Sequence, residues 1–181
     1  MIHLQARLLP DAETEKALAA TLDEFARICG WIHAQAPAHL LDVFQIRAQM
    51  YGRARRETYL SGPLCSVAIS TVATYRKASY DLAIVSGPLA PQKLVYYDNG
   101  LSIKGRQFSI SLLLPERQLS ERVLLPFDLP RPEDYQTLKS CKLRRGDLTR
   151  QGDAWLLDLQ LAPTELIYTP EGITYGELVA V

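Results

Sequence analysis

The stretch that decides the fold is CKLRRGDLTRQGDAWLLDLQL, residues 141–161. In its second half, Trp155, Leu157 and Leu159 share one side of an extended chain, and the residues between them are mostly polar. This period of two predicts a strand with one buried face. The residues Gln151-Gly152-Asp153 supply the turn chemistry of a hairpin, so a second strand precedes the buried one.

The first half of this hairpin is unusually basic. Its cations are Lys142, Arg144, Arg145 and Arg150. A run of charge is most often a solvated face that keeps a hairpin soluble. A basic strand is also what a sheet needs if its rim binds phosphates, so both interpretations stay open at this point.

Charge is distributed unevenly along the 181 residues. The formal net charge is zero, which argues against binding of nucleic acid through global charge. Residues 47–106 nevertheless carry a local charge of +6 and residues 139–150 carry +4, within an otherwise acidic chain. A neutral total therefore conceals two basic segments.

Composition favours a soluble protein with a real core. The sequence is 48% hydrophobic, and it has no apolar run long enough to span a membrane and no signal-peptide pattern. Its three cysteines are widely spaced, which fits a reducing compartment better than a disulfide framework. We expect a cytoplasmic protein without a membrane partner.

Hydrophobic periodicity orders the chain. A strand at 2–9 precedes helical patterns at 12–33, 39–59 and 64–85, and a Pro/Gly connector at 86–92 follows. Short strands are then expected at 93–97, 101–103, 107–114, 122–125, 138–148 and 154–161. The order predicts an α+β fold, in which three helices are inserted after the first strand of a sheet or small barrel.

Other chemistries have weak support. Cys29 and His33 are four residues apart, with His39 and His3 as further candidates, but no second pair has the spacing of a zinc site. Cys65 begins a helix, yet no motif identifies the histidine that a hydrolase requires. We expect no metal, no cofactor and no glycine-rich phosphate loop.

Arginine and tyrosine gather in the segment YGRARRETYL, residues 51–60. Arg53, Arg55 and Arg56 lie beside Tyr51 and Tyr59, and this is the composition of phosphate clamping combined with base stacking. The alternative is a helix end whose arginines are simply solvated.

Five short sequence motifs, in this order along the chain, resemble the N-terminal half of the TnpB (OrfB) family of transposon-encoded RNA-guided nucleases, which are related to type V CRISPR effectors. The motifs are ARLLPDAETEKALAATLDEFARICGWI, SGPLCSVAISTVATYRKASY, LSIKGRQFSISLL, RVLLPF and GDLTRQGDAWLLDLQL. The resemblance implies an OB-like small β-barrel, the wedge domain, from residues 1–10 and 93–181, with a helical recognition-like insertion over 11–92. It also implies that the RuvC-like nuclease half is absent, because this sequence stops where the strand with the first catalytic aspartate would begin.

The leading hypothesis is a nucleic-acid-binding part of a truncated or split TnpB-like protein that has no catalysis of its own. Its partners would be RNA first, duplex DNA second, and a separately encoded RuvC-like nuclease chain. The alternatives are a regulatory remnant that binds such a nuclease half, and a decayed gene product without activity. The candidate contacts are Arg47, Tyr51, Arg53, Arg55, Arg56, Tyr59, Arg76, Lys77, Lys104, Arg106, Lys139, Lys142, Arg144 and Arg145.

Overall fold

The hairpin of residues 141–161 forms two interior strands of an antiparallel sheet. The computed structural model describes residues 1–83, 87–169 and 172–177. Its elements are β1 (Ile2–Leu8), α1 (Ala12–Gln35), α2 (Val43–Glu57), α3 (Gly62–Asp81), β2 (Lys93–Tyr97), β3 (Leu101–Lys104), β4 (Gln107–Leu114), β5 (Leu119–Asp128), α4 (Pro132–Lys139), β6 (Cys141–Gln151), β7 (Ala154–Thr169) and β8 (Gly172–Glu177).

Strand β7 joins the two ends of the sequence. It pairs with β6 along the predicted hairpin and with β1 on its other side, so that Trp155 lies opposite both Arg150 and Leu8. Trp155, Leu157 and Leu159 are at most 1% exposed, as the alternation predicts. The first strand of the chain therefore belongs to the sheet formed after residue 93.

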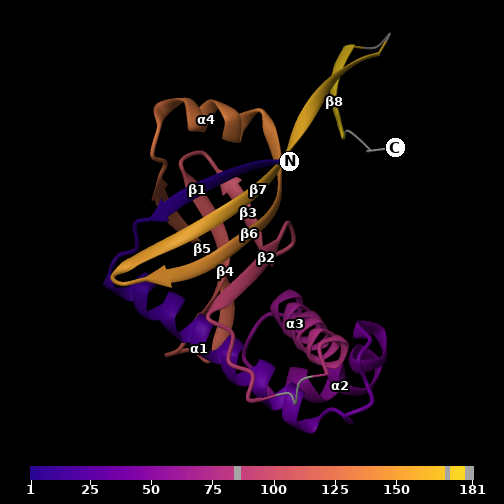
Figure 1. Cartoon of the computed structure of the whole chain (residues 1–181). Helices are drawn as coiled ribbons and strands as arrows, with labels where there is room; N and C mark the ends of the chain where they lie inside the picture. Colours follow the sequence, from indigo (N-terminus) through magenta and orange to yellow (C-terminus); the bar gives the residue numbers. More distant parts are fainter. Residues whose placement is uncertain (84–86, 170–171, 178–181) are drawn as a thin grey trace.

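The sheet curls into a nearly closed barrel. Its strand order is β2-β6-β7-β1-β5-β4-β3, and β8 pairs only with the far part of β7, in a ribbon that extends away from the barrel (Figure 1). Helices α1, α2 and α3 follow β1 in the chain and precede β2. The α+β prediction of an OB-like barrel with a three-helix insertion after the first strand is confirmed.

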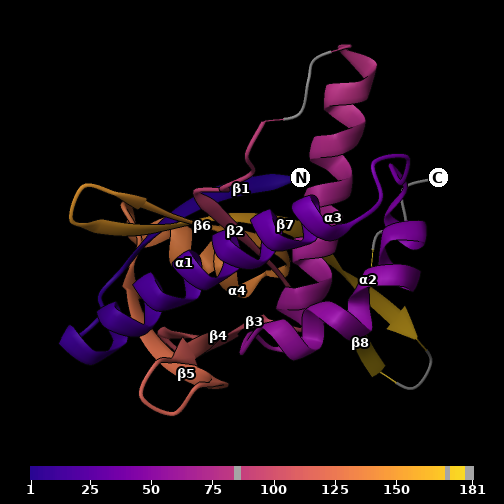
Figure 2. The same ribbon diagram turned by 90° about the horizontal axis from the view of Figure 1, so that it is seen from below.

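Helices lie at both ends of the barrel. Helix α1 begins after Asp11, whose carboxylate accepts a hydrogen bond from the Thr14 amide at 2.8 Å. It then runs across one end of the barrel, and α4 lies at the other end (Figures 1 and 2). Among the described residues, no helix combines the length and apolarity that crossing a membrane requires.

The barrel closes through side chains rather than through a complete strand ladder. Strands β2 and β3 are consecutive in the chain but form the two edges of the sheet. The Tyr96 hydroxyl crosses this seam and donates to the Ser111 carbonyl at 2.9 Å, while the Ser111 amide donates to the Gly100 carbonyl at 3.1 Å. Further along β4, the Leu113 amide donates to the Thr21 hydroxyl of α1 at 2.8 Å. Helix α1 thus satisfies an edge that would otherwise be open.

Close packing at the seam requires a glycine in β6. A Cβ at Gly146 would approach Leu101 Cδ2 of β3 to 2.4 Å and Leu157 Cδ1 to 3.1 Å. Both leucines are almost fully buried, so neither side chain has free space into which to move. Gly146 therefore allows the two edges of the barrel to meet.

One predicted strand begins too early, and one helix was not predicted. The sequence predicts a strand over 138–148, whereas α4 occupies Pro132–Lys139 and β6 begins at Cys141. The helix starts with a proline and has Glu133 and Asp134 in its first turn, where the helix dipole favours acids. The third helical pattern ends at Asp81 and not near residue 85. The strand-like run expected at 178–181 lies outside the described residues.

Replacing Tyr96 by phenylalanine should destabilise the barrel. The Tyr96→Phe variant keeps the buried ring but leaves the Ser111 carbonyl without its donor, which should lower the free energy of unfolding by about 1–3 kcal/mol. The measurement is urea unfolding followed by circular dichroism. The matched control is Tyr97→Phe, because Tyr97 is 44% exposed and should change stability by less than about 0.5 kcal/mol. Equal effects of the two substitutions would contradict this account of the seam.

Candidate nucleic-acid interface

A groove opens where α4 meets the end of the barrel. Its walls are the β3–β4 turn at 103–106, the β5–α4 loop at 128–132, and residues 135–141 at the end of α4 and the start of β6. The volume of this hollow, hereafter the α4 groove, is about 880 Å³. Arg106 and Lys139 both line it, so it unites one residue from each of the two basic segments.

An aromatic and a cationic side chain pair in the α4 groove. The Arg106 guanidinium carbon lies 5.4 Å from the centre of the Tyr135 ring, within the range of a cation–π interaction. Tyr135 in turn stacks on Phe127, and Phe127 stacks on Phe108, with centroid separations of 6.0 and 4.1 Å. Because Phe108 is fully buried, this row of rings anchors the groove to the barrel core.

Hydrogen bonds hold the Tyr135 ring in a single orientation. Its hydroxyl donates to Asp128 Oδ1 at 2.9 Å, and the Leu129 amide lies 3.3 Å from the same hydroxyl. A base that stacks here therefore meets a surface that is already ordered, which lowers the entropy lost on binding.

The two cations that line the α4 groove, Arg106 and Lys139, have no ion-pair partner among the described residues. Arg131 is ion-paired with Asp134 at 2.8 Å and lies 3.8 Å from Glu133. By contrast, among the described residues no carboxylate lies within ion-pairing distance of Arg106 or Lys139. Lys104 is exposed beside the same turn. Two of the predicted contacts, Arg106 and Lys139, thus line one hollow together with the carboxylate of Asp128.

The predicted cluster on α2 lies elsewhere. Figure 1 places α2 near the end of the molecule opposite α4. Two of its arginines lie over aromatic rings, Arg47 over Tyr51 at 5.4 Å and Arg53 over Trp31 at 5.6 Å. Arg55 donates to the Leu60 carbonyl. The exposed members of the cluster are Arg47, Arg53, Arg56 and Tyr59. Of the predicted contacts, the lining of the α4 groove therefore includes Arg106 from the first basic segment and Lys139 from the second.

Arg76 is a structural residue. It is 6% exposed, and its guanidinium donates to the carbonyls of Ala36, Pro37 and Leu40 at 2.7–3.1 Å. Its Nε also donates to Nδ1 of His33 at 3.2 Å. These bonds connect α3 to the end of α1 and the loop after it. Because its donors are taken by acceptors of the protein, Arg76 is not proposed as a nucleic-acid contact. Its neighbour Lys77 remains exposed.

The cations of β6 differ in their surroundings. Arg145 donates two hydrogen bonds to Asp147, at 2.6 and 3.0 Å, and Lys93 reaches the same carboxylate at 2.8 Å. Burial alone would raise the pKa of Asp147, but these two cations outweigh it and lower that pKa. Lys142 is exposed and Arg144 is half-buried, beside a register shift in β6. Arg145 is therefore engaged by the barrel wall.

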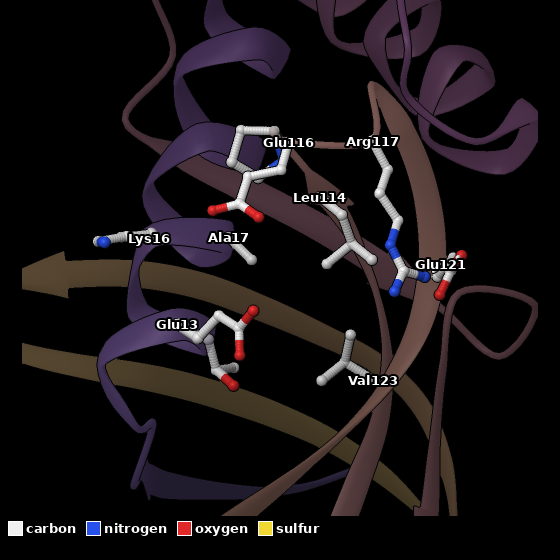
Figure 3. Close-up of a pocket in the computed structure, with 10 residues that line it drawn as sticks. Glu13, Lys16, Ala17, Leu114, Glu116, Arg117, Glu121 and Val123 are labelled. Atoms are coloured by element: carbon white, nitrogen blue, oxygen red, sulfur yellow. Dashed lines mark hydrogen bonds and ion pairs between the residues drawn. The ribbon is translucent and has the colours of Figure 1, made fainter.

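A second hollow has the opposite electrostatic character. It has a volume of about 250 Å³ and lies between the start of α1 and the β4–β5 hairpin. The carboxylates of Glu13 and Glu116 point into it (Figure 3). The Lys16 ammonium points away, and Arg117 turns toward Glu121, 3.3 Å distant. Two carboxylates point into this hollow and its cations turn away from it, so it is a poorer candidate for binding phosphate than the α4 groove, where Arg106 and Lys139 accompany one carboxylate. Arg117 therefore provides a control cation outside the α4 groove.

The metal and hydrolase sites considered from the sequence at Cys29 and Cys65 have no supporting geometry among the described residues. Burial raises the pKa of the Cys29 and Cys65 thiols, which keeps both protonated and unreactive. The His33 ring faces Tyr75 and Arg76. Within residues 1–83, 87–169 and 172–177, no three His, Cys, Asp or Glu side chains gather to hold a metal ion.

Sequence reasoning missed Tyr135 and Asp128. Tyr135 lies in α4, which was not predicted, and Asp128 lies at the end of β5 shortly before it; neither stands in a basic run. The segment RPEDYQTLK carried the missing signal, because a proline followed by two acids is typical of a helix start. The pairing of Tyr135 with Arg106 depends on tertiary structure.

Comparison with solved structures gives a structural neighbour, whereas the two sequence comparisons give none. No family model matches the sequence, and no curated protein does. Among solved structures, the chain is similar to a chain in the cryo-EM structure of a CRISPR-Cas12f ternary complex, with 12% sequence identity and a TM-score of 0.48. The match covers 82% of this chain and 41% of that chain, so this chain spans less than half the length of its neighbour. Cas12f is a type V CRISPR effector, and kinship with TnpB in particular stays a prediction.

Stability should depend on pH through His33. Burial and the nearby Arg76 guanidinium lower the pKa of His33 from its ordinary 6.5, so the folded chain keeps a neutral imidazole where the unfolded chain protonates it. The free energy of unfolding should therefore fall as the pH drops below 6.5. Urea unfolding across this window measures the slope. In His33→Gln, where an amide oxygen can still accept from Arg76, the slope should shrink; an unchanged slope would rule out His33 as its source.

Proposed function

We propose that this chain is a nucleic-acid-binding module that holds an unpaired segment of RNA at the α4 groove. The observation that carries the proposal is the Arg106–Tyr135 pair, which lies beside Lys139 in one hollow. Aromatic and guanidinium planes stack with bases of any sequence, and the surrounding cations attract the phosphates. The groove thus combines the two interactions that a single strand requires.

Duplex geometry fits this groove less well than a single strand does. The bases of a duplex are stacked on one another, so their faces are not available to Tyr135 or Arg106. The exposed cations of α2 offer a second, separate surface suited to the backbone of a longer RNA or of duplex DNA. We propose RNA as the primary ligand and DNA as a secondary one.

We also propose that the chain contributes binding and not cleavage to a larger TnpB-like system. The resemblance of its sequence motifs to the wedge and recognition parts of that family supports this role, with guide RNA and target DNA as the ligands. A separately encoded RuvC-like nuclease chain would supply the cleavage. The purified chain, incubated with labelled RNA and DNA in the presence of Mg²⁺, should leave both intact; cleavage that copurifies with the chain would refute this division.

Substitutions in the α4 groove should weaken binding of RNA. The double variant Arg106→Ala/Lys139→Ala should reduce the slope of log affinity against log salt by roughly 0.7 for each phosphate contact that is lost. Tyr135→Leu, which keeps apolar bulk over Phe127, should weaken binding by about 1–3 kcal/mol through loss of stacking. Fluorescence anisotropy with a labelled RNA stem-loop at two salt concentrations measures both effects.

Matched variants separate the two basic surfaces. Arg117→Ala removes a cation that is ion-paired beside the acidic hollow, so it should leave affinity and slope unchanged. Arg53→Ala/Arg56→Ala should lower the affinity for long RNA more than for a decamer, because α2 is remote from the α4 groove. If the unmutated chain does not bind RNA at low salt, the nucleic-acid proposal fails and association with a nuclease half becomes the better candidate.

A further inference from the structure

The α4 groove contains a carboxylate that phosphate binding does not explain. Asp128 lines the hollow and is exposed, and its Oδ1 accepts hydrogen bonds from the Tyr135 hydroxyl at 2.9 Å and from the Leu129 amide at 3.0 Å. Two donors on one oxygen fix the plane of the carboxylate. Asp128 is therefore ordered beside the ring on which we propose that a base stacks.

This carboxylate has no cationic partner in the described part of the chain. The nearby Arg131 is taken by Asp134 at 2.8 Å, and Arg7 stands opposite Asp128 in the β1–β5 register without an ion pair to it. The second oxygen, Oδ2, accepts no hydrogen bond from any described residue. A negative acceptor in this position repels phosphate, so its natural complement is a group that presents N–H donors.

The four RNA bases differ in the donors that they offer to such a group. Guanine presents two adjacent donors, N1–H and N2–H, and can donate one of them to Oδ2 while the other, a donor and not an acceptor, lies next to Oδ1, which already accepts two hydrogen bonds. Cytosine and adenine present one amino group beside an acceptor nitrogen, and uracil presents one N–H between two carbonyls. Each of these three bases therefore turns at least one acceptor toward the negative charge.

We infer that the α4 groove selects guanine in single-stranded RNA, with Asp128 as the residue that determines specificity. This inference rests on the proposed function, because it assumes that a base stacks beside the Arg106–Tyr135 pair. Tyr135 then has two functions: its ring provides part of the stacking surface, and its hydroxyl holds Asp128 so that the carboxylate faces the edge of the base.

The experiment compares decamers of uridine that carry one central guanosine, adenosine, cytidine or uridine. The full chain should bind the guanosine decamer roughly 5- to 100-fold more tightly than the other three, as measured by fluorescence anisotropy. Inosine in place of guanosine lacks the N2 amine and should abolish most of the difference without any change to the protein. Asp128→Asn keeps an oxygen that accepts from Tyr135 and should reduce the preference to less than about 2-fold.

Each outcome has one consequence. Equal binding of all four decamers overturns the guanine inference and leaves the proposed function standing, whereas no binding of any decamer refutes the proposed function itself. A preference that survives in Asp128→Asn, or with inosine, excludes Asp128 as its source. The exposed Asp23→Asn on α1 is the matched control and should keep the full preference. Free GMP should compete weakly; competition equal to that of the decamer would assign the groove to a free nucleotide instead.

Discussion

The closure of the barrel depends on the interactions that bridge the seam between its edge strands, β2 and β3. Strands β2 and β3 follow one another in the chain, yet the sheet runs the other way round the barrel, so the backbone groups at both edges need partners from outside the ladder. Tyr96 supplies one from within the barrel, and Thr21 supplies another from α1. Because Thr21 also donates to the Ala17 carbonyl, its hydroxyl is held in place by the helix itself. The position of α1, and of the helices that pack on it, follows from the need to cover this edge.

Arginine serves two purposes in this molecule, and only the fold distinguishes them. Arg76 and Arg145 have guanidinium donors aimed at carbonyl or carboxylate oxygens of the protein, which a planar, multidentate cation satisfies well. Arg106 instead lies against the Tyr135 ring at a groove wall. In the sequence all three look alike, since each stands in a basic segment beside apolar or aromatic residues. Positive local charge in the sequence therefore does not separate the arginines that bind the protein itself from the arginine that lines the α4 groove.

Local patterns predicted most of the architecture. The alternation through Trp155, the Asp11 cap and the helical stripes were all read correctly, because each depends on neighbours within a few residues. The short helix α4 was missed because its eight residues span barely two turns, too few for a periodic stripe. The candidate site was missed together with α4, because Tyr135 meets Phe127 and Arg106 only in the folded chain. Because the groove is assembled from three separate segments, none of them carries a periodic sequence pattern that would indicate it.

The α4 groove is coupled to the core through its aromatic row. The turn that carries Arg106 needs a glycine, because Gly105 has a positive φ of 62° that other residues adopt at a cost. On the opposite wall, Tyr135 rests on Phe127, which packs in turn on the buried Phe108 of β4. The same strand, β4, forms the seam with Tyr96 and α1. A change that loosens the seam should therefore also move the surface on which we propose that a base stacks. In this fold, the interaction that closes the barrel and the geometry of the proposed site depend on the same strand.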